Sequence, residues 1–486
     1  MLFNSFSFLI FLPIVFVSYY ALPYKYRNAL LFVASSIFYM YFVPKYILIL
    51  FFIICADYLL AFQIAKRTGR QRAFFLTLSI LINLGTLFFF KYFNFFNENI
   101  ASLAQALHFN YPHTLLTFAL PLGLSFHVFQ SLSYVIEVYK GKYAPERNLL
   151  NYGVYVLFFP QLVAGPIERP AHLLPQLESR HDFDPLLARR GLERMLWGFF
   201  KKLVIADQIS RIIEVIYPTL PHESLSIFFF AALFAYQLYC DFSGYSDIAI
   251  GTAMLFGITL TENFDRPFAA KSITELWRRW HMSLSSWLRD YLYYPLIFWL
   301  GPISKFKIYV STLITFTLIG LWHGASWTFV VFGLLQGIYL VAEGLTDPLR
   351  KKVSAMWGKA WHFAWSFFQI LLTFFLFAAS LVFFRSETVG RGWELFKALF
   401  TIPEPSVLID QFLHNEGYIG MEVMLVPTIV AIIVLEVVQY VQAKKKTFHV
   451  LDAYPRALRY GTYYACVLTI LFFGYLGGQS FIYFQF

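Results

Sequence analysis

Residues 318–333, LIGLWHGASWTFVVFG, decide the class of the fold. Mostly apolar residues continue on both sides of this stretch, and one ionisable side chain, His323, stands within it. A helix that crosses a membrane needs about 20 mostly apolar residues. The stretch therefore predicts membrane-embedded helices. A histidine at that depth is costly, so His323 is a candidate for function and is suited to act as a base near neutral pH.

The composition of the whole chain agrees with this class. Of its 486 residues, 59% are hydrophobic and 14% are charged, whereas soluble domains average about 45–50% apolar and about 25% charged residues. This composition excludes a water-soluble globular protein, a disordered chain and a disulfide scaffold. The 58 Phe, 32 Tyr and 11 Trp residues exceed what lipid-facing helices require. Because Tyr and Trp favour sites with one wet end, they indicate extensive interface or an internal polar path.

The apolar stretches predict an all-α polytopic membrane protein with roughly 11–13 transmembrane helices, plus interfacial and re-entrant helices. Basic residues gather in the odd-numbered loops, beginning with Lys25 and Arg27, and again at 444–446. They explain the net charge of +10 without nucleic acid, and they place both termini outside the cell. The first span lacks a basic leader and is expected to be retained. We divide the chain into N-terminal helices, a core with interfacial helices, and C-terminal helices with an aromatic tail: 1–115, 116–345 and 346–486.

Cysteine spacing and short motifs argue against a bound metal or cofactor. Cys55, Cys240 and Cys466 lie in or beside apolar stretches without a CxxC spacing, so we expect small buried thiols. The sequence has no metal-ligand cluster, Walker motif or dinucleotide loop. We therefore expect no metal site and no pump driven by ATP.

Two segments concentrate polar residues between apolar ones. Residues 271–290, KSITELWRRWHMSLSSWLRD, have the pattern of one amphipathic helix in the membrane interface, with His281 near its buried stripe. An ordinary interfacial histidine beside arginines is an equally good interpretation of His281. In residues 236–251, YQLYCDFSGYSDIAIG, Asp241 is expected to cap a helix beside a break in the span at Gly244. Such a break is tolerated only beside a cavity or inside protein.

Three long motifs together resemble the membrane-bound O-acyltransferase family. They are YCDFSGYSDIAIG, NFDRPFAAKSITELWRRWHMSLSSWLRDYLYYPL and GLWHGASWTFVVFGLLQG, at 239–251, 263–296 and 320–337. The match covers roughly residues 120–345, and the final GGQSFIYFQF is also similar to this group. The most similar branch is that of the bacterial alginate and peptidoglycan O-acetyltransferases.

The resemblance implies helices around a central tunnel and acyl transfer centred on His323, with His281 as the second family histidine. It implies acetyl-CoA or another acyl thioester as the cytosolic donor, with no bound cofactor, and a polysaccharide as the extracytoplasmic acceptor. It also implies a bacterial inner-membrane protein that works with a separate periplasmic or extracellular acetyltransferase. Six further residues are expected to bind substrate or support the tunnel: Asp241, Ser243, Tyr245, Trp280, Trp322 and Ser326.

Several alternatives stay open. IFWLGPISKFK at 297–307 replaces a Gly-Gly-Asn stretch of alginate-type members, which leaves the acceptor polysaccharide undetermined. D-alanyl transfer to teichoic acid, transport of a lipid-linked sugar without acyl chemistry, and a non-catalytic membrane scaffold are the other functions considered. In the teichoic-acid system a tail similar to the end of this chain belongs to a small partner protein. We hypothesise that Tyr483 relays the acyl group, against the alternative of an aromatic anchor for the last helix.

Overall fold

The computed structural model describes residues 1–112, 114–219, 224–299, 301–355, 359–401, 422–477 and 481–482. Every regular element in these residues is a helix, which confirms the predicted all-α class. The chain groups into two units, Met1–Met195 with Ser246–Thr261, and Leu196–Tyr245 with Glu262–Phe486. The division into three parts expected from the sequence stays a prediction.

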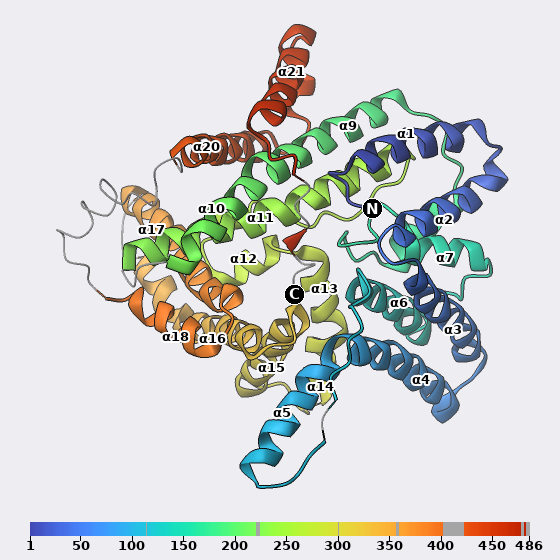
Figure 1. Ribbon diagram of the computed structural model, residues 1–486, viewed down its shortest axis with the longest axis horizontal. Coiled ribbons are helices and arrows are strands. Elements are labelled where there is room, and N and C mark those ends of the chain that lie inside the picture. Colours follow the sequence, from blue (N-terminus) through green and yellow to red (C-terminus); the bar gives the residue numbers. More distant parts are fainter. Residues whose placement is uncertain are drawn as a thin grey trace. The chain divides into compact units, whose positions relative to one another are not determined.

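The first unit is built around contacts of α3 with α4 and α6, and of α7 with α2 (Figure 1). At its centre Asp57, on α3, is buried and accepts hydrogen bonds from Ser79, Asn83 and Ser131 at 2.6–2.7 Å. These donors compensate a carboxylate in an apolar helix bundle. The elements are α1 (Phe6–Ala21), α2 (Tyr24–Met40), η1 (Pro44–Tyr46), α3 (Ile47–Lys66), α4 (Gly69–Leu87), η2 (Phe88–Tyr92), α5 (Phe93–Ala106), α6 (Leu124–Tyr139), α7 (Leu149–Leu157) and α8 (Pro170–Glu178).

The second unit holds the shorter helices around the candidate site and several long apolar helices (Figure 1). Its elements are η3 (Phe200–Ala206), α10 (Asp207–Ile216), η4 (Tyr217–Thr219), η5 (Pro267–Ala269), α12 (Ile273–Arg279), α13 (Met282–Leu288), η6 (Arg289–Tyr293), α14 (Tyr294–Trp299), α15 (Lys305–His323), α16 (Trp327–Ala355), α17 (Lys359–Arg385), α18 (Val389–Ala398), α20 (Glu422–Lys445), η8 (Val450–Ala453) and α21 (Arg456–Phe473). Two further helices, α9 (Pro185–Phe199) and α11 (Ser224–Leu255), contribute residues to both units.

The continuity of α11 corrects the break expected at Gly244. The helix runs through this position, so the span that was expected to break there is one continuous element. A Cβ on Gly244 would lie 2.8 Å from the carbonyl oxygen of Gly198 on α9. Glycine is therefore needed for close packing of α9 on α11, and the intact hydrogen-bond ladder of the helix tolerates it.

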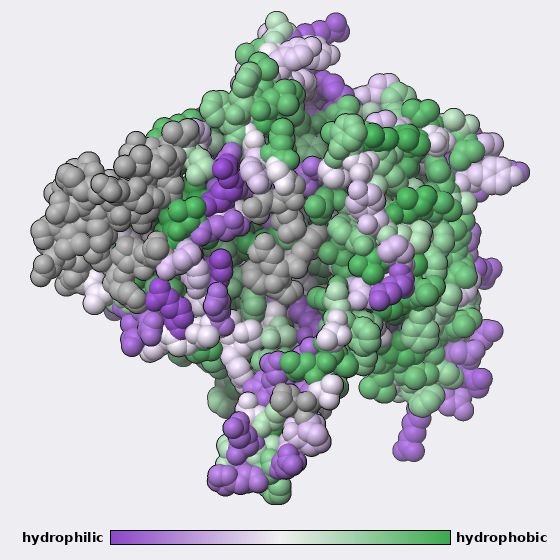
Figure 2. All heavy atoms as spheres, in the orientation of Figure 1, coloured by the Kyte–Doolittle hydropathy of each residue, from purple (hydrophilic) through white to green (hydrophobic). Residues whose placement is uncertain are grey.

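Seven helical stretches in the described residues are long and apolar enough to cross a membrane. In the first unit, the exposed side chains on α3 and α4 include Leu48, Leu59, Phe74 and Leu81, each more than 60% exposed. Figure 2 shows hydrophobic residues over the surface where Figure 1 draws these two helices. Such a surface is stable in lipid, as a multi-pass membrane protein requires. The seven stretches are Pro44–Lys66, Gly69–Ala106, Ser224–Leu255, Lys305–His323, Trp327–Val353, Trp361–Arg385 and Met424–Lys445.

Helices α15 and α16 form a tight hairpin that carries His323 at its turn. Their backbones meet at two glycines, because a Cβ on Gly320 would lie 2.1 Å from the carbonyl oxygen of Phe329 and 3.0 Å from Cα of Gly333. The extended backbone of Gly324 ends α15 directly after His323. Glycine at the crossing thus fixes the two helices at a separation that no larger residue permits.

Candidate active site

His281 lies at a sharp break between two short helices and not within one long helix. It is the N-cap of α13, it has a left-handed backbone with φ of 45°, and its side chain is fully buried. The amphipathic helix expected over residues 271–290 is therefore wrong as a single element. Two backbone hydrogen bonds hold the break, from Met282 to Asn263 and from Asp265 to Arg279, each 2.9 Å. A left-handed residue other than glycine is strained, and such strain is often kept at functional sites.

The side chain of Asn263 fixes the tautomer of His281. Oδ1 of Asn263 accepts the backbone N–H of Ser283 at 3.3 Å and the hydroxyl of the same residue at 2.9 Å. The same oxygen lies 3.2 Å from Nδ1 of His281. Because this oxygen is an acceptor, Nδ1 of the neutral ring carries the proton and Nε2 carries the lone pair. Burial lowers the pKa of His281 well below its usual value, and the neighbouring charge of His323 lowers it further.

His323 is buried among aromatic rings at the end of α15. Only 4% of it is exposed. Its ring centroid lies 5.0 Å from that of Trp322, 5.4 Å from that of Phe384 and 6.2 Å from that of Phe332. The turn that follows includes Ser326, whose hydroxyl oxygen accepts the N–H of Thr328 at the start of α16. His323 therefore sits in an apolar cage at a rigid helix end, where a proton-transfer group is shielded from water.

The two histidines belong to one cluster. The indole of Trp322 contacts both imidazoles, with its ring centroid 6.0 Å from that of His281 and 5.0 Å from that of His323. On another side of His281 the ring of Phe242, from α11, packs edge-on at 4.5 Å. Segments that are far apart in sequence thus bring both imidazoles into a buried, aromatic environment.

A buried ion cluster in the second unit joins residues of η3, α10 and α11. Nζ of Lys202 is 2.6 Å from Oδ1 of Asp241 and 2.8 Å from Oδ1 of Asp207. Burial alone would lower the pKa of Lys202, but the two carboxylates outweigh it and raise the pKa, so the ammonium keeps its charge. Burial raises the pKa of Asp207 to about 7 against the attraction of Lys202. Asp241 lies in the middle of α11, so the helix-capping role expected for it is wrong.

Sequence reasoning missed Lys202. It stands in FFKKLVIAD, where a lysine pair interrupts an apolar run, and that interruption is the signal that marks it. The segment folds as the π-helical turn η3, in which Lys201 and Lys202 are both buried. A π-turn shifts the helical register and is frequent at functional sites.

The end of the chain reaches the same cluster. The backbone N–H of Ile482 donates to Oδ2 of Asp241 at 2.7 Å. The ring of Phe481 packs on Phe242 and Tyr245, with centroid distances of 5.5 and 5.2 Å. Tyr483, the expected acyl relay, lies outside the described residues.

The other residues expected at the site belong to the same unit as the two histidines, but their surroundings differ. Trp280 is buried in an aromatic group with Phe264 and Phe377, at centroid distances of 5.3 and 5.1 Å. Ser243 is 2% exposed, one helical turn before Asp247 on α11. The structure thus brings together His281, Trp322 and His323, and separately Asp241 with the end of the chain.

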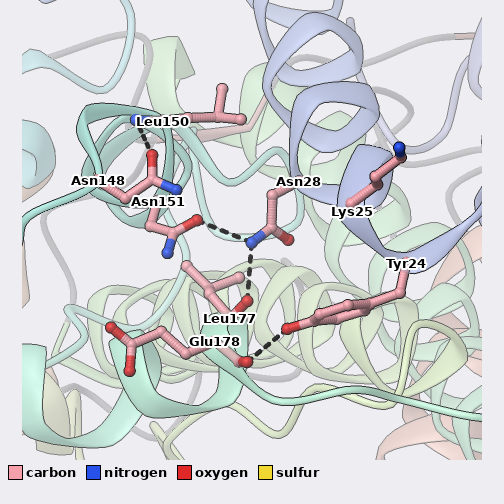
Figure 3. Close-up of a pocket in the computed structure, with 8 residues that line it drawn as sticks. All are labelled: Tyr24, Lys25, Asn28, Asn148, Leu150, Asn151, Leu177 and Glu178. Atoms are coloured by element: carbon pink, nitrogen blue, oxygen red, sulfur yellow. Dashed lines mark hydrogen bonds between the residues drawn. The ribbon is translucent and has the colours of Figure 1, made fainter.

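A polar pocket of about 250 Å³ belongs to the first unit and contains none of the expected residues. Figure 3 shows Asn28 between its neighbours, donating to Oδ1 of Asn151 at 2.9 Å and to the carbonyl of Leu177 at 2.7 Å. The hydroxyl of Tyr24 donates to the carbonyl of Glu178. These bonds tie α2, α7 and α8 together, which gives the pocket wall a structural role.

Comparison with known proteins identifies the family of the chain. The family model described as MBOAT, membrane-bound O-acyltransferase family, matches residues 75–385. The chain is 36% identical over 407 residues to the protein named probable alginate O-acetylase AlgI of Azotobacter vinelandii, covering 82% of this chain and 78% of that protein. It is 31% identical over 435 residues to the peptidoglycan O-acetyltransferase of Helicobacter pylori, covering 82% and 80%. Identity to the teichoic acid D-alanyltransferase of Bacillus subtilis is 28% over 272 residues, covering 54% and 67%.

The chain therefore belongs to the membrane-bound O-acyltransferase family. It is a multi-pass membrane enzyme that transfers an acyl group to oxygen. Both histidines of the cluster fall within the range that the family model matches.

Proposed function

We propose that this enzyme moves an acetyl group from cytosolic acetyl-CoA toward an extracytoplasmic polysaccharide, with His323 as the general base. The observation that carries the proposal is the buried cluster of two imidazoles joined by Trp322 in the family-matched part of the chain. The names of the alginate and peptidoglycan relatives, which align with 82% of this chain, support an acetyl group and a polysaccharide acceptor.

The proposed chemistry needs two proton transfers, both through His323. The acceptor oxygen attacks the thioester carbonyl while His323 removes its proton, so a C–O bond forms and the C–S bond breaks. The thiolate leaves and takes a proton from the protonated imidazole. The single O–H of the attacking group is used by His323, so His281, whose Nε2 carries the lone pair, accepts a hydrogen bond from a different donor of the bound substrates and helps to orient them. The surrounding aromatic side chains limit hydrolysis by excluding water.

Tyr483 is the proposed intermediate acceptor. It directly follows Ile482, whose N–H is held by Asp241. Its phenol oxygen takes the acetyl group while His323 takes the phenol proton. In the second step a hydroxyl of the next acceptor attacks the acetyl group, and the phenol leaves with the proton that this hydroxyl gives up. The test is Tyr483→Phe, for which we expect acetyl-CoA binding without transfer. Unchanged acetylation by this variant would support the alternative of an aromatic anchor.

The cellular setting follows from the loop charges. We propose a bacterial inner-membrane location with both termini outside, because basic residues such as Lys25 and Arg27 mark loops that stay in the cytosol. An outer C-terminus puts Tyr483 on the side of the acceptor. A periplasmic acetyltransferase partner completes the proposed route to the polysaccharide.

One assay separates the candidate functions. Purified protein in lipid receives labelled acetyl-CoA with a periplasmic extract and polysaccharide, and parallel samples receive a labelled D-alanyl thioester carrier. We expect acetyl transfer by the wild type and by His172→Ala, which changes a histidine of the first unit, and loss of transfer by His323→Ala. Use of the D-alanyl donor alone would favour teichoic-acid chemistry. Use of neither donor would refute the proposal.

A further inference from the structure

The described residues near the end of the chain contact the rest of the second unit in two places. At the first, Gln208 donates to the carbonyl of Phe473 at 2.7 Å, and the N–H of Tyr475 donates to the carbonyl of Leu203 at 3.0 Å. The guanidinium of Arg211 also lies 4.9 Å from the ring of Tyr475. This attachment ends α21 against η3 and α10.

The second attachment uses the ion cluster. Asp241 divides its two oxygens between a cation and the backbone, with Oδ1 on Lys202 at 2.6 Å and Oδ2 on the N–H of Ile482 at 2.7 Å. Phe481 and Ile482 are only 3% and 5% exposed. A hydrogen bond to an ionised acceptor is about twice as strong as a neutral one, so a carboxylate that is paired with Lys202 is a strong acceptor for the backbone of the tail.

We propose that Lys202, Asp207 and Asp241 form an anchor for residues 481–482, and that this anchor determines whether the acyl group is passed on or lost to water. The first part depends on contacts alone, whereas the second part rests on the proposed acetyl transfer. The link between them is Phe242, whose ring contacts both Phe481 and His281. A released tail uncovers the ring of Phe242, which borders the histidine cluster. Lys202 and Asp241 are thus positioning residues for the transfer.

Acceptor counting gives a sharp test. In Asp241→Asn only one acceptor oxygen remains, while the ammonium of Lys202 and the N–H of Ile482 each need one. We expect the amide oxygen to stay with the charged ammonium, the stronger donor, so the NH₂ faces the N–H of Ile482 and the tail is released. In the double variant Lys202→Met/Asp241→Asn the competing cation is gone, so the amide oxygen turns to Ile482 and part of the hold returns.

The reporter for the tail is Ile482→Cys in a protein whose Cys55, Cys240 and Cys466 are alanine. Maleimide labelling of this cysteine is measured in lipid without any substrate. We expect Asp241→Asn to raise the labelling rate at least tenfold, which corresponds to about 1.4 kcal/mol. The double variant should label more slowly than Asp241→Asn alone.

The matched control is Asp247→Asn on the same helix, a buried carboxylate 3.0 Å from Arg194. This substitution weakens a buried ion pair but leaves the contacts of residues 481–482 intact. The cysteine at position 482 should therefore be labelled at the rate of the parent protein. The anchor is refuted if the rates of Asp241→Asn and the parent agree, if Asp247→Asn labels as fast, or if the double variant shows no recovery.

A second readout tests the consequence for the reaction. With labelled acetyl-CoA, we expect Asp241→Asn to shift the ratio of hydrolysis to transfer at least tenfold toward hydrolysis, with recovery in the double variant. A released tail with an unchanged ratio would refute the role in partitioning and leave the anchor intact. If the wild type consumes no acetyl-CoA, the proposed function fails, while the labelling result still decides the anchor.

Discussion

The hairpin of α15 and α16 makes Gly320→Ala the most informative single substitution. The new Cβ would lie 2.1 Å from the carbonyl oxygen of Phe329, whereas ordinary contacts begin at 3.4 Å, so the backbones must separate by up to 1.3 Å. Overpacking of this kind costs about 1–3 kcal/mol. His323 stands three residues later on the same helix, and a displacement of about 1 Å at a reacting group costs about a hundredfold in rate.

We therefore expect Gly320→Ala to lower kcat for acyl transfer about a hundredfold and to lower the unfolding temperature in detergent. The control is Gly461→Ala in α21, where a Cβ meets nothing within 4 Å. Alanine is favoured over glycine in a helix by about 1 kcal/mol, so this variant should be at least as stable as the wild type. An unchanged kcat and unfolding temperature for Gly320→Ala would refute the claim that the glycine contact sets the position of His323.

Three further substitutions test other contacts. In Trp277→Phe the side-chain oxygen of Gln336 loses its 3.0 Å donor, so the free energy of unfolding should fall by about 1–3 kcal/mol, and an equal thermal or denaturant midpoint would contradict this. In Asn263→Ala the acceptor that orients His281 is lost together with the acceptor of two hydrogen bonds from Ser283, so the free energy of unfolding should fall by at least about 1–3 kcal/mol. Single-turnover transfer by the folded variant should slow about 10–100-fold, and an unchanged rate would contradict the orienting role. The hydrogen bond to Glu168 raises the pKa of His172. The stability that this pair contributes is therefore fully present below about pH 6.5 and is lost as the pH rises through the raised pKa. The unfolding temperature of the wild type should therefore approach that of His172→Gln between about pH 6 and about pH 9, and a constant gap would contradict the assignment.

The sequence was sufficient to predict the class of the fold, and it singled out both histidines as candidates, for a physical reason. Apolar length and the cost of an ionisable group in a membrane are local properties, and they identify a membrane-embedded His323 without any tertiary information. The buried position of His281 is not local. It depends on a left-handed turn that Asn263 holds from 18 residues away, and an amphipathic pattern cannot report such a turn.

The anchor of the chain end was beyond prediction for a similar reason. Asp241 and Ile482 are 241 residues apart, and their contact uses a backbone N–H that every residue except proline possesses. Gly244 was misinterpreted because a glycine that breaks a helix and a glycine that admits a neighbouring helix look identical in sequence. Only the packing of α9 distinguishes them.

The most direct test of the proposed base is the single-turnover rate of acetyl transfer with His323 replaced. His323→Ala and His323→Gln are compared with the wild type in lipid at saturating acetyl-CoA, with unfolding temperatures measured in parallel. Loss of a general base costs about 10²–10⁴-fold, so both variants should fall in that range while they stay folded and bind the donor. Transfer at the wild-type rate by either folded variant would contradict the assignment of His323 as the base.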